Sequence, residues 1–242
     1  MKRAILSDIH ANMDAFARVL DDIHRCAVDE ILCLGDNIGY GAEPERVVTT
    51  LKNRAIVSVM GNHELGAIDP ASRSWFNPHA RRALVKTVAM IGDPTLACLA
   101  ALPRFCLRDN ARFVHGFPPD LISTYLFEAS DARLRRALGR MSEQLCFVGH
   151  THRLELIAFD GAELEKRPLP PGPTVLEPHK RYLINIGSVG QPRDGDLRAK
   201  YVIWDREKAT IEVRCVAYDN HAAAAKIIAA GLPRAYADRL LP

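Results

Sequence analysis

The chain has 242 residues, of which 48% are hydrophobic and 25% are charged, and its net charge is +3. This composition is ordinary for a globular enzyme, and the length suits a single α/β domain over residues 1–242. The weak net charge, with no long run of like charges or apolar residues, gives no reason to expect nucleic acid or a membrane as a partner.

The first two-thirds of the chain alternates short β-rich apolar runs with segments of helical periodicity. The expected strands are residues 3–7, 30–34, 55–59, 112–114 and 144–148. The expected helices are residues 12–25, 44–52, 77–90, 94–101 and 131–138. Asn12 is a suitable N-cap for the first helix, and Pro44 suits the first turn of the second.

After residue 150 the pattern changes to strands and turns. Further strands are expected at residues 153–158, 182–186, 199–204 and 209–217, followed by a short helix at 221–230. The five prolines between Pro168 and Pro178 predict an extended loop inside the domain. Strand–helix alternation followed by a strand-rich half predicts an α/β fold in which two sheets pack face to face.

The cysteines show no CxxC pairing. Most lie inside apolar runs, at Cys26, Cys33, Cys98, Cys106, Cys146 and Cys215. This pattern predicts reduced thiols in a cytoplasmic protein, without disulfides or a structural zinc site. The apolar stretch Ala4–Leu6 is too short for the core of a signal peptide.

Polar motifs follow five of the expected strands: SDIH, LGDN, MGNHE, VHG and VGHTH. Open α/β sheets place their ligand sites at the carboxyl ends of the strands. We therefore expect a group of side chains from these motifs to converge at one edge of the sheet. They are Asp8, His10, Asp36, Asn62, His63, His115, His150 and His152.

These side chains offer the chemistry of a metal site. On an extended segment Asp8 and His10 would point the same way, as would His150 and His152. Two aspartates, an asparagine and four of the histidines provide oxygen and nitrogen donors without a thiolate, which suits Mn²⁺, Fe, Zn²⁺ or Co²⁺. Seven donors are too many for one ion and suit two ions about 3.5–4 Å apart that share a bridging carboxylate.

In their order, SDIH, GDN, GNHE, HG and GHTH resemble the signature of the calcineurin-like metallophosphoesterase superfamily. The later stretch NIGSVGQPRDGD resembles its small bacterial branch, often labelled phosphodiesterase or diadenosine-tetraphosphatase-like. The resemblance extends from the first residue to the AAGLP segment near the C-terminus. It implies a four-layer α-β-β-α sandwich, with helices outside two mixed sheets.

The resemblance also implies a role for each residue of the cluster. The first metal ion would be held by Asp8, His10 and His152, and Asp36 would bridge both ions. The second ion would be held by Asn62, His115 and His150. His63 would be a proton donor to the leaving group instead of a ligand.

The sequence departs from the Ser/Thr protein phosphatases of this superfamily at one motif. Those enzymes have GDxxDRG, in which the second acid orients the catalytic histidine, whereas here Asn37, Ile38 and Gly39 follow Asp36. A carboxylate partner of His63 would have to come from elsewhere, and the adjacency of Glu64 in sequence does not show that it reaches the ring. The departure argues against a protein phosphatase.

Two further residues are candidates for substrate binding. Arg193, in a glycine-containing loop implied to face the metals, could bind phosphate oxygens, or the loop could be a turn and nothing more. Asn12 could contact phosphate through the helix N-terminus or act only as an N-cap. Tyr40 is a weaker candidate for a pocket wall. His24, His79, His179 and His221 are expected to be ordinary surface or core residues and not metal ligands.

The sequence therefore predicts a phosphoesterase with two divalent metal ions, manganese being the first choice for assay, that hydrolyses small phosphate mono- or diesters. A metal-bridging hydroxide would attack phosphorus, and nucleotides and dinucleoside polyphosphates are among the candidate substrates. The alternatives are a non-catalytic scaffold that retains the fold and binds a protein, or a Ser/Thr protein phosphatase. The sequence does not specify the substrate or the oligomeric state.

Overall fold

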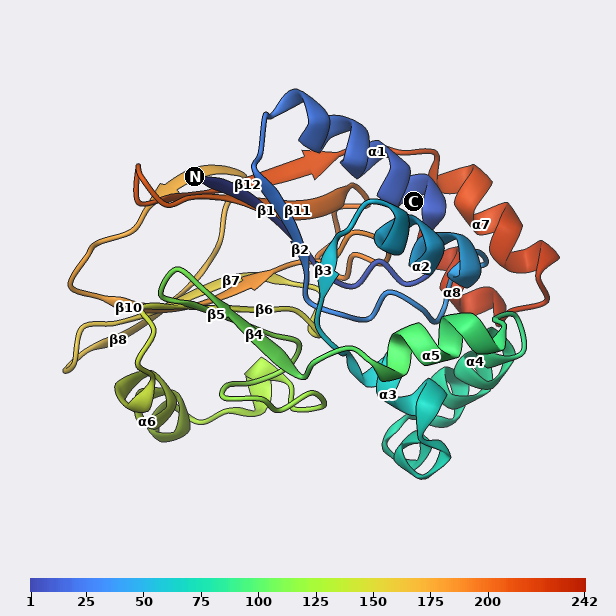
Figure 1. The fold of residues 1–242 in the computed structure, drawn as a ribbon, viewed down its shortest axis with the longest axis horizontal. Coiled ribbons are helices and arrows are strands. Elements are labelled where there is room, and N and C mark those ends of the chain that lie inside the picture. Colours follow the sequence, from blue (N-terminus) through green and yellow to red (C-terminus); the bar gives the residue numbers. More distant parts are fainter.

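Two six-stranded mixed sheets face each other in the computed structural model, which describes residues 1–242 (Figure 1). The first sheet has the strand order β3 (Val57–Ser58), β2 (Glu30–Cys33), β1 (Lys2–Leu6), β11 (Ala199–Asp205), β12 (Thr210–Val216) and β9 (Gly172–Val175). The second has the order β4 (Phe105–Arg108), β5 (Ala111–Val114), β6 (Leu145–Val148), β10 (Arg181–Ile186), β7 (Leu154–Phe159) and β8 (Leu164–Pro168).

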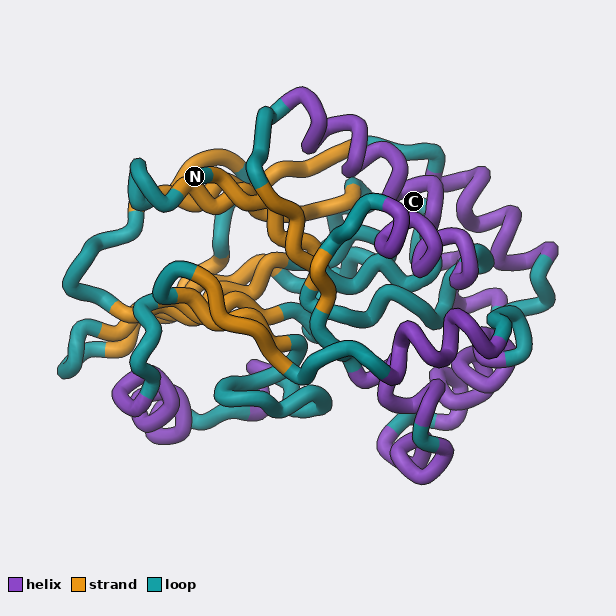
Figure 2. The backbone as a smooth tube through the Cα atoms, viewed as in Figure 1, coloured by secondary structure: helices purple, strands orange, loops and turns teal.

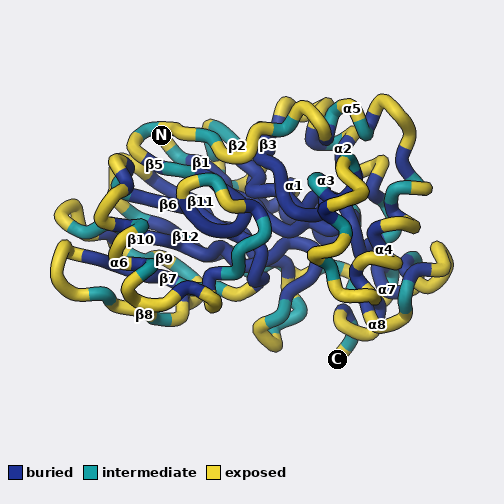
Figure 3. Tube along the Cα trace, turned by 90° about the horizontal axis from the view of Figure 1, so that it is seen from below, coloured by how far each residue is buried: buried dark blue, intermediate teal, exposed yellow.

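Alternation along the strands divides their side chains between two cores. In β1, Ile5 faces the other sheet, where it joins a cluster that includes Phe113 and Trp204, whereas Ala4 and Leu6 face the helix on the outside. This period of two is what a strand buried on both faces requires. The central strands are buried accordingly, and the exposed residues lie around the rim (Figure 3).

Helices cover the outer faces. α1 (Met13–Arg25) packs on the first sheet through one apolar stripe that includes Phe16 and Val19, and α6 (Asp131–Arg140) packs on the second through Leu134 and Leu138. The remaining helices gather at one end of the molecule (Figure 2). They are α2 (Pro44–Asn53), α3 (Asn62–Ile68), α4 (Pro78–Val88), α5 (Asp93–Ala100), α7 (Asn220–Ala229) and α8 (Arg234–Asp238).

The predicted four-layer α-β-β-α sandwich is confirmed, and the predicted helices and strands are present with their ends shifted by a few residues. Several elements were not predicted from the sequence: β4, β8, β9, α3 and α8, together with the short 3-10 helices η1 (Pro70–Trp75) and η2 (Leu126–Glu128). No helix of the protein is long and apolar enough to cross a membrane.

The extended loop expected between Pro168 and Pro178 is wrong as a single loop, because a strand lies within it. β8 extends to Pro168, and residues 172–175 form β9, which pairs antiparallel with β12. Both are edge strands with a neighbour on one side only. Proline lacks a backbone N–H, but an edge strand tolerates it because one side of the strand makes no ladder.

The topology brings the five motifs together. β1, β2 and β3 run parallel in the first sheet, and β5 runs parallel to β6 in the second. The motifs follow the carboxyl ends of these five strands, and donor atoms from all five motifs lie close together. Parallel strands therefore deliver all of the predicted side chains to one place.

Candidate metal centre

The eight predicted side chains form one buried cluster. None of these residues is more than 9% exposed, although each carries a charged or polar group. Buried charged groups require partners or a metal ion to offset the loss of hydration. The cluster contains three overlapping groups whose donor atoms lie close enough together to hold a cation: Asp8–His10–His152, His10–Asp36–His63 and Asp36–His115–His150.

One side of the cluster is formed by Asp8, His10 and His152. Oδ1 of Asp8 lies 3.1 Å from Nε2 of His152 and 3.7 Å from Nε2 of His10. The same Oδ1 atom is buried and accepts no hydrogen bond. An uncompensated carboxylate oxygen aimed at two imidazole nitrogens is a feature of a site for a cation.

The other side is formed around Asp36. Its Oδ2 atom lies 3.2 Å from Nε2 of His115 and 3.8 Å from Nε2 of His10, so this carboxylate contacts both sides of the cluster. Nε2 of His115 also lies 3.1 Å from Nδ1 of His150 and 3.2 Å from Oδ1 of Asn62. The geometry therefore places Asp36 between the two groups of donors.

Hydrogen bonds to the backbone orient the imidazole rings. In each of four rings the outer nitrogen donates to a carbonyl oxygen: His10 to Ile38, His115 to Leu34, His150 to Ser123 and His152 to Gln191. Because a carbonyl oxygen only accepts, the proton of a neutral ring must be on its outer nitrogen. The inner nitrogen then presents a lone pair to the cluster, as metal coordination requires.

Two pairs of these inner nitrogens lie close together. Nε2 of His10 is 3.1 Å from Nε2 of His152, and the His115–His150 pair described above has the same spacing. Two lone pairs at this distance repel each other unless a proton or a metal ion lies between them. The donor set, its tautomers and its burial thus fit a metal centre with nitrogen and oxygen ligands.

Electrostatic interactions within the cluster shift its pKa values. Burial would raise the pKa of Asp36, but His115 and the other imidazoles hold it well below its usual range. Burial would lower the pKa of His115, but the Asp36 carboxylate raises it to about 9. Burial lowers the pKa of His150 to about 3. Without metal, a proton is therefore retained between His115 and Asp36 at neutral pH.

The backbone at these motifs is a series of tight turns. The expectation that Asp8 and His10, and His150 and His152, lie on extended segments is wrong, because all four have positive φ values of 54°, 48°, 67° and 59°. Asp36 also has a positive φ of 53°. Non-glycine residues rarely adopt this conformation, which costs about 1 kcal/mol or more each, and such strain gathers at functional sites.

Glu64 has a structural role that was not predicted from the sequence. Its carboxylate accepts hydrogen bonds from the backbone N–H groups of Asp36 (2.8 Å), Asn37 (2.7 Å), Ile38 (3.3 Å) and Gly61 (2.8 Å). Burial and the negative charge of Asp36 raise its pKa to about 7. Glu64 therefore holds the turn that presents Asp36, and its position three residues after Gly61, the N-cap of α3, was the available signal.

No carboxylate orients His63 through its Nδ1 atom. This atom is buried and lacks a hydrogen-bond partner, while Nε2 lies 4.0 Å from Oδ2 of Asp36. The ring is held instead by edge contacts with Tyr40 and Phe76, at centroid distances of 4.5 and 5.0 Å. Gly39 is required beside it, because a Cβ atom there would lie 2.1 Å from Nδ1.

The two candidate substrate-binding residues differ in their surroundings. Asn12 uses Oδ1 to accept a hydrogen bond from the N–H group of Ala15, as an N-cap, and Nδ2 to donate to the carbonyl of Gly190. We therefore retain its interpretation as an N-cap. Arg193 is half-buried, with one Nη2 hydrogen bond to Gln191 and a buried Nε that has no partner. Its role in binding stays a prediction.

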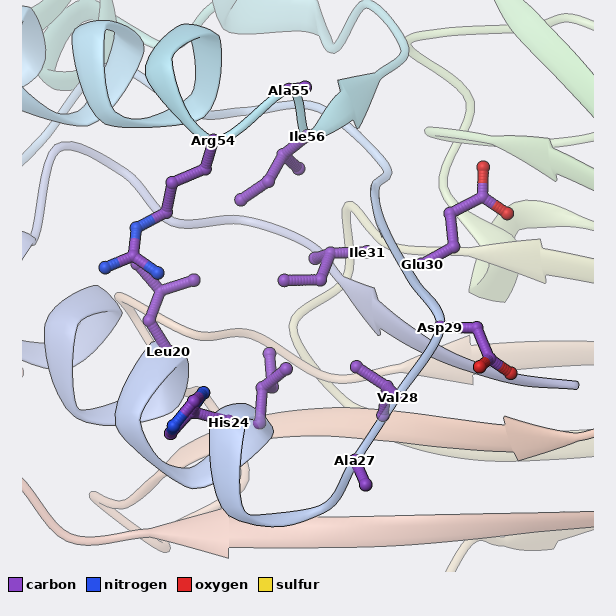
Figure 4. Close-up of a pocket in the computed structure, with 11 residues that line it drawn as sticks. Leu20, His24, Ala27, Val28, Asp29, Glu30, Ile31, Arg54, Ala55 and Ile56 are labelled. Carbon is purple, nitrogen blue, oxygen red and sulfur yellow. The ribbon is translucent and has the colours of Figure 1, made fainter.

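The metal cluster is distinct from a surface cavity of about 460 Å³ shown in Figure 4. That cavity lies between the C-terminal end of α1 and the start of β2, with Leu20, Ile31 and Ile56 pointing into it. Because Asp36 follows the carboxyl end of β2, the cavity is at the opposite end of that strand. His24 lines this cavity and takes no part in the cluster.

Comparison with known proteins assigns the family. The family model for the calcineurin-like phosphoesterase superfamily domain matches residues 1–209. An uncharacterized protein of Methanocaldococcus jannaschii is 37% identical over 245 residues, which cover 98% of this chain and 96% of the relative.

Two solved structures are similar to this protein over nearly the whole chain. A metallophosphoesterase from Sphaerobacter thermophilus has a TM-score of 0.85 and 34% identity, covering 99% of this chain and 98% of the other. A hypothetical protein from Pyrococcus horikoshii shares the fold at 17% identity, with a TM-score of 0.79 and coverage of 99% and 97%. The chain belongs to the calcineurin-like phosphoesterase superfamily.

Proposed function

We propose that the protein is a phosphoesterase that hydrolyses small phosphate mono- or diesters with two divalent metal ions. One observation carries the proposal: seven oxygen and nitrogen donors from five strand ends meet in a buried cluster in which four imidazoles present their inner nitrogens. A scaffold that binds protein partners would not require this oriented donor set. The absence of a carboxylate at Nδ1 of His63 disfavours a Ser/Thr protein phosphatase.

The two halves of the cluster suggest how the ions would be shared. Asp8, His10 and His152 would hold one ion, and Asn62, His115 and His150 the other, with Asp36 contacting both. Divalent ions bound there would lower the pKa of a water molecule towards about 7 and offset the negative charge of a phosphate ester. Mn²⁺, Fe, Zn²⁺ and Co²⁺ all suit these donors.

His63 is positioned to transfer a proton beside this centre. Burial lowers its pKa to about 4, more than the Asp36 carboxylate raises it, so the ring is neutral at neutral pH in the free site. A phosphate ester brought against Nε2 would raise this pKa, because a nearby negative charge favours the protonated ring. His63 would then donate its proton to the departing oxygen. The positive charge of Arg193 also acts on His63 and lowers its pKa, so Arg193 is our candidate for contacts to phosphate oxygens.

The proposal is tested by metal analysis combined with hydrolysis of p-nitrophenyl phosphate and bis(p-nitrophenyl) phosphate in the presence of Mn²⁺, Zn²⁺ or Co²⁺. We expect metal-dependent release of p-nitrophenol that is abolished by a chelator and by Asp36→Asn. His24→Ala changes an exposed histidine outside the cluster and is the matched control. A protein that retains no metal and is inert with every divalent ion would contradict the proposal and favour a scaffold.

A further inference from the structure

Three aromatic rings form a stack that extends from the metal cluster to the surface. The ring of Tyr125 lies 3.9 Å from that of His150, with an interplanar angle of 12°. The ring of Phe127 lies 4.9 Å from that of Tyr125, with an angle of 14°. His150 is a predicted ligand, and Phe127 is 68% exposed. The stack therefore begins at the metal centre and ends at an exposed ring.

The exposure of Phe127 is not explained by packing of the core. The short helix η2 buries Leu126 in the core beneath the second sheet, while Phe127, the next residue, faces outward. A single exposed apolar side chain is common and by itself indicates nothing. Here the ring also stacks on Tyr125 and borders a pocket, and exposed stacked rings of this kind bind planar groups.

The pocket beside Phe127 has a volume of about 290 Å³. It is also lined by Thr151, which lies between the predicted ligands His150 and His152 in the chain. The stacked rings connect this pocket to the cluster, because Phe127 borders the pocket and the ring of Tyr125 stacks on both Phe127 and His150. We refer to the space lined by Phe127, Thr151, Arg153, Leu154, Glu155, Lys166, Arg167 and Pro168 as the ring pocket.

The charges around the ring pocket favour an anionic ligand. Three cationic side chains line it, against the single carboxylate of Glu155. Lys166 and Arg167 are paired with acidic residues, whereas Arg153 is exposed and forms no ion pair. A free guanidinium beside an aromatic ring is suited to bind a phosphate group of a ligand whose planar part stacks on the ring.

We propose that the ring pocket binds the nucleoside part of a nucleotide substrate, with the base stacked on Phe127 and a phosphate other than the reacting one held by Arg153. The proposal rests on the proposed phosphoesterase function, whose substrate class it specifies. Tyr125 supports both elements, because it covers one face of the predicted ligand His150 and one face of Phe127.

The test compares two hydrolysis-resistant probes on metal-loaded protein by calorimetry. Adenosine 5′-(α,β-methylene)diphosphate carries the base and two phosphorus groups, and methylenediphosphonate has the same two groups without the nucleoside. We expect Phe127→Ala to weaken binding of the adenosine probe by about tenfold, the order of one stacked base, and to leave methylenediphosphonate unchanged. Phe127→Trp should retain binding, and ligand stacking should quench the fluorescence of the introduced indole.

Arg153→Gln should weaken the binding of both probes, because both contain the second phosphorus group. The matched control for Phe127→Ala is Val175→Ala, which truncates a similarly exposed apolar side chain on β9 of the first sheet. The matched control for Arg153→Gln is Arg136→Gln, which removes an exposed arginine from a different pocket. Neither should change the affinity of either probe. The proposal is overturned if Phe127→Ala affects the two probes equally or affects neither.

The two proposals can fail separately. If the wild-type protein hydrolyses no phosphate ester but Phe127→Ala selectively weakens the adenosine probe, the ring pocket stands and the phosphoesterase function is wrong. If p-nitrophenyl esters are hydrolysed but Phe127→Ala has no selective effect on the probes, the ring pocket is wrong and the phosphoesterase function stands.

Discussion

His63 is held at the metal cluster by aromatic edges and a close glycine, without an acid at Nδ1. If it donates a proton to the leaving group, its loss should reduce turnover without removing metal. We predict that His63→Ala retains its metal content and loses about 10²–10⁴ in kcat, most strongly for alkyl esters with poor leaving groups. Steady-state kinetics measures kcat, and elemental analysis measures the metal content of the variant. Full activity on an alkyl phosphate ester would show that the proton-donor role is wrong.

Metal binding should depend on pH through His115. Its pKa is raised to about 9 by Asp36, so at pH 7 the metal-free ring carries a proton that an incoming ion must displace. Protonation competes with the metal below this pKa, and the affinity should therefore rise as the pH increases from 6 to about 9. Chelator competition at several pH values measures the affinity. A metal affinity that stays constant over this pH range would contradict the raised pKa of His115.

Because Glu64 accepts four backbone hydrogen bonds, we predict that Glu64→Gln strongly destabilises the protein. Glu64→Gln replaces one acceptor oxygen by an NH₂ group that faces backbone N–H donors. Leaving buried donors unpaired should lower the free energy of unfolding by about 2–4 kcal/mol and weaken metal binding through the Asp36 turn. Chemical denaturation measures the stability, with exposed Glu163→Gln as the matched control. Equal stability of the two variants would contradict this role.

At the scale of elements, a buried carboxylate connects α1 to the first sheet. Asp22 accepts hydrogen bonds from the hydroxyl of Tyr201 on β11 (2.8 Å) and from Arg214 on β12 (3.1 Å). Burial would raise the pKa of Asp22, but these bonds lower it overall. The interaction therefore stabilises the protein above the unfolded pKa of about 3.9 and is lost as the pH falls through the lower folded value.

We predict that Asp22→Asn lowers the free energy of unfolding at pH 7 by about 2 kcal/mol and reduces its dependence on pH below about 4. Denaturant unfolding at pH 7 and at lower pH measures both effects. The neighbouring Asp21→Asn, at an exposed position of the same helix, should change neither. If Asp22→Asn is as stable as the wild type at pH 7, the hydrogen bonds of Asp22 do not stabilise the packing of α1 on the first sheet.

The helices and strands predicted from the sequence are those with a regular apolar periodicity. The stripe on α1 and the alternation in β1 were readable because each buries one face against a defined neighbour. β9 was missed because Pro173 argues against a strand unless the strand is known to lie at an edge. α3 was missed because its first turn contains the polar GNHE motif, where the residues that mark function replace an apolar pattern.

At the scale of the whole molecule, the site was predictable because parallel strands of both sheets end in one region. The order of the motifs identified the residues of the cluster, but the tight turns with positive φ at Asp8 and His10 could not be read from spacing. The roles of Glu64 and of the stacked rings depend on contacts between segments distant in sequence, which periodicity does not report.

The central claim is that two metal ions share the cluster around Asp36. Anomalous diffraction from crystals soaked in Mn²⁺ tests it most directly. We predict two peaks about 3.5–4 Å apart, one beside Asp8, His10 and His152 and the other beside Asn62, His115 and His150, with Asp36 contacting both. A single peak, or none, under saturating Mn²⁺ would contradict the claim.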